Sequence, residues 1–119
     1  MDSQAFATFF QDVINNSKSG LELKETFGFD FYAVSVEPGK KYDRIVVRTG
    51  GDVGCGGSAH FFITKDGVIL GVSSWTTPNF KRCFGNLNTV NEWKWDRYPS
   101  EPESLKGLSS LVPKAERLR

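Results

Sequence analysis

The sequence has few of the residues and patterns that identify a function directly. Its 119 residues include one histidine and two cysteines, without C-x-x-C or H-x-x-x-H spacing, so no metal site is indicated. No apolar run approaches the roughly 18 to 20 residues that span a bilayer. The opening MDSQAFATFFQDV lacks the basic segment of a signal peptide. We therefore expect a cytoplasmic protein without a metal, a cofactor or a membrane partner.

An excess of charge of one sign is also lacking. Fifteen basic and 14 acidic side chains give a net charge of +1, which produces no overall field for capturing nucleic acid or an acidic membrane. Any charged binding surface must therefore be local. Cys55 and Cys83 could form one disulfide, but two cysteines in such a chain more often stay reduced.

Aromatic residues make up 13% of the chain, and an aromatic content this high excludes wholesale disorder. The length fits one domain, which we place at residues 1–100. Asp2 or Ser3 can cap the start of a helix predicted at about residues 3–17, and Gly20 suits the left-handed position after its end. The apolar stripe that predicts this helix consists of Phe6, Phe9, Phe10, Val13 and Ile14.

From Phe29 onward the apolar period changes to two. The runs FDFYAVSVE and YDRIVVRT flank the turn EPGKK. The runs SAHFFITK and VILGVSSW flank Asp66 and Gly67, a dipeptide favoured in tight hairpins. The pattern predicts an α+β fold, in which the N-terminal helix packs on a four-stranded antiparallel sheet of two hairpins.

The sequence after Trp75 mixes aromatic residues with turn formers. We expect an irregular, aromatic-rich C-terminal segment with a short helix around residues 79–84, which wraps the sheet rather than extending it. Residues 101–119 are predicted to form a polar C-terminal tail or a short docked helix.

Alternation assigns each strand residue to one of two faces of the sheet. The face that the helix covers takes mainly apolar residues, namely Tyr32, Val34, Val36, Ile45, Val47, Ala59, Phe61, Ile63, Val68, Leu70 and Val72. The second face takes a mixture, namely Phe31, Ala33, Tyr42, Arg44, Val46, Arg48, Ser58, His60, Phe62, Ile69, Gly71, Ser73 and Trp75. There are two interpretations of this second face. It stays partly open as a binding surface, or it is covered by C-terminal residues, namely Phe80, Phe84, Leu87, Trp93 and Trp95.

The candidate ligand-binding residues combine cations, which pair with phosphate, and aromatic rings, which stack on bases. They are Arg44, Arg48, His60, Phe62 and Trp75 on the second face, with Lys81 and Arg82 from NFKRCFGN. If the protein is an enzyme, His60 is the candidate general base, with Ser58 and Arg44 beside it. The glycine-rich TGGDVGCGG is not a phosphate-binding P-loop, and we interpret it as a mobile connection before the third strand.

Four sequence blocks occur in a recognisable order: YDRIV at 42–46, SAHFFITKDG at 58–67, SSWTTP at 73–78 and KRCFGNL at 81–87. Together they resemble a family of small uncharacterised proteins found mostly in bacteriophage and viral metagenomes. The family-like positions are Arg44, Ser58, His60, Lys65, Gly67, Ser74, Trp75 and Pro78. The glycine-rich insert at 50–57, and Thr76 where the family has Lys, depart from that pattern. The resemblance implies a viral origin and a location in the host cytoplasm, and implies no particular activity.

Three functions fit these observations. The first is a non-enzymatic module that binds single-stranded nucleic acid or a nucleotide-like anion. The second is a protein-binding inhibitor of a host enzyme or defence complex, and the third is a small hydrolase or nuclease that uses His60. An exposed edge strand in a small sheet also makes a homodimer plausible.

Overall fold

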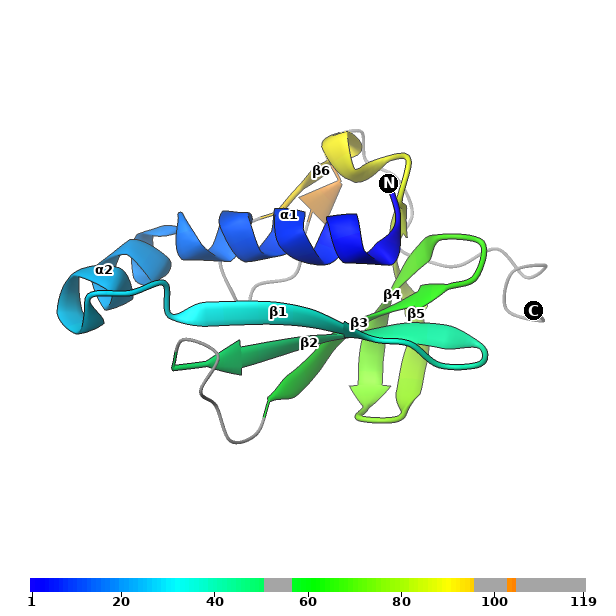
Figure 1. The fold of residues 1–119 in the computed structure, drawn as a ribbon. Coiled ribbons are helices and arrows are strands. Elements are labelled where there is room, and N and C mark those ends of the chain that lie inside the picture. Colours follow the sequence, from blue (N-terminus) through cyan, green and yellow to red (C-terminus); the bar gives the residue numbers. More distant parts are fainter. Residues whose placement is uncertain (51–56, 96–102, 105–119) are drawn as a thin grey trace.

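A computed structural model describes residues 1–50, 57–95 and 103–104. The helices and strands follow in the order α1 (Ser3–Asn15), α2 (Lys18–Phe27), β1 (Tyr32–Glu37), β2 (Tyr42–Thr49), β3 (Ser58–Thr64), β4 (Val68–Ser74), β5 (Thr77–Asn86), the 3-10 helix η1 (Val90–Glu92), β6 (Trp93–Lys94) and β7 (Glu103–Ser104). The five longer strands form one antiparallel sheet in the order β1-β2-β3-β4-β5, and α1 lies along one face of it (Figure 1). The α+β fold class is confirmed, with one strand more than the four predicted. None of the helices within the described ranges combines the length and the apolar content needed to cross a membrane.

The N-terminal helix forms where its apolar stripe predicts it. The Asp2 carboxylate accepts a hydrogen bond from the Ala5 N–H at 2.8 Å and so caps the first turn. Gly20 does not follow the helix as a left-handed residue. It lies inside α2, which Ser17 caps, and a Cβ at this position would collide with the backbone carbonyl of Ile14. Glycine is needed here because α2 starts directly against the end of α1.

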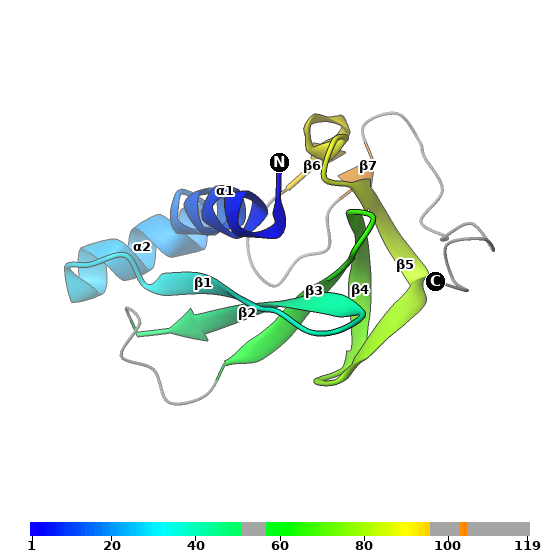
Figure 2. The ribbon, with the colours of Figure 1, turned by 45° about the vertical axis from the view of Figure 1, so that its right-hand side comes forward.

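The main core lies between α1 and the sheet, and the C-terminal aromatic residues complete it. The rings of Phe6 and Trp95 meet edge to face with centroids 5.2 Å apart, and Phe84 meets Trp93 in the same way at 5.8 Å. Leu87 packs against this same core. Of the five C-terminal residues expected to cover the second face, Phe84, Leu87, Trp93 and Trp95 therefore lie on the helix side, where η1 and β6 run beside α1 in Figure 2, and Phe80 alone packs on the second face.

Strand β4 presents the opposite set of side chains from the one predicted. Phe62 pairs with Leu70 and Ile63 pairs with Ile69, which makes the connecting loop three residues long, from 65 to 67. A two-residue turn at Asp66 and Gly67 would have shifted the register by one residue and reversed the faces. The helix-side core therefore includes Ile69, whereas the second face carries a smaller apolar cluster formed by Phe62, Val68, Leu70 and Cys83, with Tyr42, Val72 and Phe80 packed against it.

Residues 79–84 extend the sheet as part of β5, so the short helix predicted there is wrong. Leu70 pairs with Cys83, while the next residue, Gly71, pairs with Asn79. Residues 80–82 are therefore inserted as a bulge in this edge strand. The turn-forming Asn79 stabilises the start of this bulge, because its side chain accepts a hydrogen bond from the Lys81 N–H at 3.0 Å.

The outer edge of β1 is bonded by side chains of α1. The Asn15 amide donates to the Tyr32 carbonyl oxygen at 2.9 Å and accepts from the Tyr32 N–H at 3.0 Å. Gln11 accepts from the Val34 N–H at 2.9 Å. Because these backbone groups are the ones an added strand would need, the edge is protected against strand addition. A homodimer stays a prediction.

Several predictions for the C-terminus fall mainly outside the described residues. Glu103 and Ser104 pair with Lys94 and Trp93 as a two-stranded ladder, and the rest of the predicted tail or docked helix lies outside the described ranges. Most of the glycine-rich connection also lies outside them, as does Cys55, the possible disulfide partner of the buried Cys83.

Candidate nucleic-acid interface

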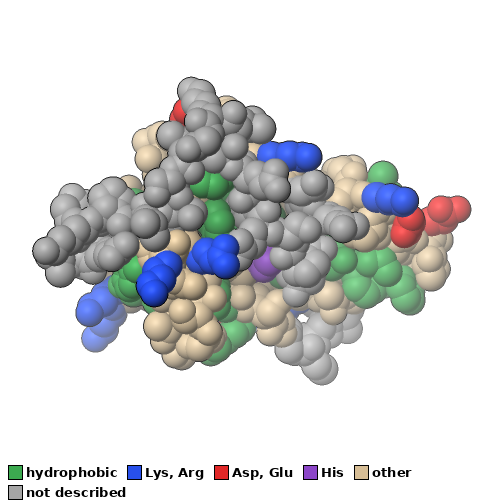
Figure 3. All heavy atoms as spheres, turned by 180° about the vertical axis from the view of Figure 1, so that it is seen from behind, with side chains coloured by type: hydrophobic (Ala, Val, Ile, Leu, Met, Phe, Trp, Pro, Cys, Tyr) green, Lys and Arg blue, Asp and Glu red, His purple; other side chains and the backbone are tan. Residues whose placement is uncertain are grey.

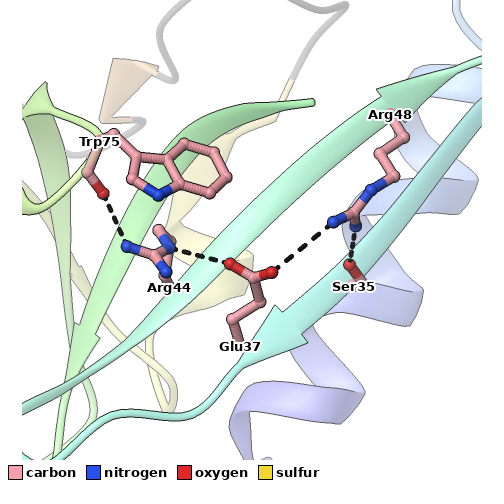
Figure 4. A network of polar contacts seen from close by, with 5 residues as sticks. All are labelled: Ser35, Glu37, Arg44, Arg48 and Trp75. Atoms are coloured by element: carbon pink, nitrogen blue, oxygen red, sulfur yellow. Dashed lines mark hydrogen bonds and ion pairs between the residues drawn. The ribbon is translucent and has the colours of Figure 1, made fainter. Parts of the chain in front are cut away.

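The second face of the sheet carries a polar network centred on Arg44 in β2. Its Nε donates to the Glu37 carboxylate at 3.0 Å, and its Nη1 donates to the backbone carbonyl of Trp75 at 2.9 Å. The guanidinium carbon also lies 4.4 Å from the centroid of the Trp75 ring (Figure 4). At this distance the cation is attracted by the electron density of the ring face. Arg44 thus connects β2 to the turn between β4 and β5.

The cross-strand register explains why Glu37 joins this network. Glu37 lies directly opposite Arg44 in the hairpin of β1 and β2. The other carboxylate oxygen of Glu37 lies 3.6 Å from Nη2 of Arg48, and Nη1 of Arg48 donates to the Ser35 hydroxyl at 2.8 Å. Ser35, Glu37, Arg44, Arg48 and Trp75 are called the arginine cluster below.

A hollow of about 190 Å³ adjoins the arginine cluster. It lies between the turn of β1 and β2 and the turn of β4 and β5, and is lined by Glu37, Pro38, Gly39, Lys40, Lys41, Tyr42, Arg44, Phe62 and Thr76. Three cationic residues, Lys40, Lys41 and Arg44, therefore border one small opening together with Tyr42, while Phe62 is only 3% exposed and belongs to the apolar cluster of this face. Trp75, at the neighbouring turn, has 44% of its surface exposed. This combination suits a ligand that has both an anionic group and a flat ring.

His60 does not lie with Arg44. Ile45 pairs with Phe61, and the next residue, Val46, pairs with Ala59, so His60 is the extra residue of a β-bulge. The bulge reverses the alternation, and the imidazole stacks on Phe10 of α1 with ring centroids 5.4 Å apart. Burial lowers the pKa of His60 from its ordinary value of 6.5 to about 4, because the charged imidazolium would lose its hydration.

The structure consequently does not bring His60 and Ser58 together with Arg44, as the enzyme hypothesis requires. The same bulge pairs Ser58 with Val47, which belongs to the helix-side core. Ser58 and His60 therefore share the helix side of the sheet, whereas Arg44 lies on the other side. Among the described residues, no three His, Cys, Asp or Glu side chains are grouped as potential metal ligands.

The remaining predicted binding residues divide between the two faces. Phe62 is the cross-strand partner of Arg44 and borders the same hollow. Lys81 and Arg82 are exposed in the bulge of β5, and Arg82 lies close to Gly71 and Phe84, on the helix side. On the face shown in Figure 3, two cationic side chains lie close together left of the centre and the others stand apart. The cluster around Arg44 combines cations with an exposed indole ring, which suits a charged ligand that carries a flat ring.

Sequence reasoning missed three residues of this site. Lys40 and Lys41 were assigned only to a turn, and Glu37 only to the end of a strand, yet all three border the hollow. The turn EPGKK contained the signal, because a hairpin closed there brings Glu37 opposite Arg44 and places two lysines beside them.

Comparison with protein-family models, with curated proteins and with solved structures yields no match for this chain. The resemblance of residues 40–88 to a phage-associated family therefore stays a prediction.

Proposed function

We propose that this protein binds single-stranded nucleic acid, or a nucleotide-like anion, at the hollow beside the arginine cluster. The observation that carries the proposal is the contact of Arg44 with Trp75, at 4.4 Å, beside an opening bordered by two lysines. Arg44 borders the opening together with the two lysines, and the exposed indole ring of Trp75 lies against Arg44.

The chemistry of such a ligand matches the two kinds of side chain. A base can stack on the exposed part of the Trp75 indole, an interaction worth about 1–3 kcal/mol per base and tolerant of sequence. Lys40, Lys41 and Arg44 then face the phosphates, which supply most of the affinity at low salt. We expect binding with little base specificity, because stacking on an indole ring accepts any base and phosphate contacts carry no sequence information.

The predicted viral origin is compatible with this function, since the ligand would be met in the cytoplasm of the host. The competing hypothesis is a protein-binding inhibitor of a host enzyme or defence complex. Such an inhibitor has no need of affinity for oligonucleotides, so one titration separates the two.

The test is fluorescence anisotropy with a labelled oligothymidine of about 12 nucleotides, a length within the usual range for small single-strand-binding folds. Trp75→Ala should weaken binding about tenfold, as expected for the loss of one stacked base. Phe27→Ala is the matched control, because Phe27 is an exposed aromatic residue, 52% accessible, on α2. Equal affinity of the two variants, or a flat titration of the unaltered protein, would contradict the proposal.

A further inference from the structure

Glu37 occupies the centre of the arginine cluster in an unusual manner. One of its carboxylate oxygens lies 3.0 Å from Nε of Arg44, and the other lies 3.6 Å from Nη2 of Arg48. A single carboxylate therefore bridges two guanidinium groups, as Figure 4 shows. Two oxygens of a phosphodiester can make the same bridge, because arginine recognises carboxylate and phosphate with the same donor geometry.

Both arginines have other contacts that would hold them if Glu37 moved away. Arg44 donates to the Trp75 carbonyl oxygen and lies against the indole ring. Arg48 donates to the Ser35 hydroxyl at 2.8 Å. The two guanidinium groups would therefore stay in place for an incoming anion.

The carboxylate is the most accessible member of the bridge. The Glu37 side chain is 36% exposed, against 24% for Arg44 and 28% for Arg48. It is also the last residue of β1, next to the turn that starts at Pro38. These ion pairs are only partly exposed, but another anion in the place of Glu37 would keep both arginines paired, so the exchange leaves neither guanidinium without a counter-charge.

We propose that Glu37 is an internal competitor that holds the site of a backbone phosphate, and that a phosphodiester of the bound strand displaces it. This inference rests on the proposed function and adds a regulation to it. Glu37 lowers the affinity for single strands and limits binding to ligands that can replace a carboxylate on both arginines. A weakly anionic ligand, or a neutral one, does not release the pair.

Glu37→Gln tests the proposal, because it removes the charge and keeps the size of the side chain. In the same anisotropy titration, this variant should bind oligothymidine about fivefold more tightly than the unaltered protein, the size of effect expected for releasing one partly exposed ion pair. The slope of log affinity against log salt concentration should stay the same, because the strand occupies both arginines in the unaltered protein as well, once Glu37 is displaced.

Asp12→Asn is the control for the loss of one negative charge. Asp12 is an exposed residue of α1, which covers the other side of the sheet. This variant should change neither the affinity nor the slope appreciably. Thermal unfolding of each variant shows whether the fold is retained.

The outcomes separate the two proposals. If the unaltered protein binds and Glu37→Gln binds equally or more weakly, Glu37 positions the arginines and the competitor role is wrong. Equal gains in Glu37→Gln and Asp12→Asn would likewise contradict it, since the effect would be one of overall charge. If neither the unaltered protein nor Glu37→Gln binds, the proposed function itself is contradicted, and the competitor role with it.

Discussion

The guanidinium carbon of Arg44 lies 4.4 Å from the centroid of the Trp75 ring, and the same guanidinium donates a hydrogen bond to the Trp75 carbonyl oxygen. This double contact joins β2 to a turn that lies 31 residues later in the sequence. It fixes an exposed aromatic ring beside a cationic hollow, where a rigid ring loses little freedom when it stacks on a base. The account of this protein as a single-strand binder depends on that relationship.

The planar shape of Arg44, and not only its charge, should matter. Arg44→Lys keeps the positive charge but cannot bond Glu37 and the Trp75 carbonyl while lying against the ring. We expect the affinity for oligothymidine to fall about fivefold, in line with a loss of about 1 kcal/mol for an exposed cation–π contact. The measurement is the anisotropy titration described above. Arg82→Lys, an exposed arginine on β5, is the control and should bind like the unaltered protein.

Asn15 should be important for stability, because it bonds both backbone groups of Tyr32 from a buried position. Asn15→Ala leaves a buried donor and a buried acceptor without their partner. A loss of about 2–3 kcal/mol in the free energy of unfolding follows. Urea denaturation followed by circular dichroism measures it.

Asn16 provides the matched control for that experiment. Its side chain is exposed, and its amide donates a hydrogen bond to the backbone carbonyl oxygen of Asp12. Asn16→Ala should cost less than about 0.5 kcal/mol, as is usual for surface substitutions. Similar losses in the two variants would show that the bonding of the β1 edge does not stabilise the fold.

Gly85 combines a left-handed backbone with a crowded position. Its φ is +76°, and a Cβ there would lie 2.6 Å from Nε1 of Trp93. Gly85→Ala should therefore cost both the backbone strain of about 1–2 kcal/mol and a repacking cost of similar size. Gly28, with φ +80° and nothing within 4 Å of an added Cβ, isolates the first contribution. If Gly28→Ala and Gly85→Ala lower the unfolding midpoint equally, the contact with Trp93 is not restrictive.

His60 should make the protein less stable in mild acid. Its pKa is about 4 in the folded protein and 6.5 ordinarily, so between these values the unfolded chain binds more protons and stability falls as the pH falls. From pH 8 to pH 5 this residue accounts for a loss of about 2 kcal/mol.

The contribution of His60 can be separated from that of other groups with His60→Phe. This variant keeps a ring against Phe10 and removes the titration. The stability difference between it and the unaltered protein should grow by about 2 kcal/mol between pH 8 and pH 5. A difference that stays constant across this range would show that the imidazole is not desolvated in the fold.

Local periodicity was sufficient to predict the parts of the fold that depend on nearby residues. The stripe from Phe6 to Ile14 and its Asp2 cap predicted α1, and the two alternating pairs of runs predicted the hairpins of β1 with β2 and of β3 with β4. The neighbourhood of Arg44 and Arg48 also followed from the predicted second face, because no bulge interrupts β2 opposite β1. Trp75 was assigned to that face through the alternation of β4, which is reversed in the structure, and it reaches Arg44 from the turn after β4.

The errors arose where one residue changes the register. A three-residue loop in place of a two-residue turn reversed the faces of β4, and a bulge moved His60 to the helix side. Both arrangements are compatible with the sequence and differ only in how the side chains pack against α1 and against the C-terminal aromatic residues. Such long-range packing is not visible in periodicity, which also explains why β5, with its inserted residues 80–82, did not appear to be a strand.

The salt dependence of oligothymidine binding measures how many phosphates the residues around the hollow neutralise. Lys40, Lys41 and Arg44 border the hollow, and each phosphate that they neutralise contributes a slope of about −0.7 for a single strand. The account predicts a slope of about −2 in the plot of log affinity against log salt concentration for the unaltered protein. Replacing both lysines by alanine should reduce that slope to about −0.7. Binding that does not depend on salt, or the absence of binding at low salt, would contradict the account.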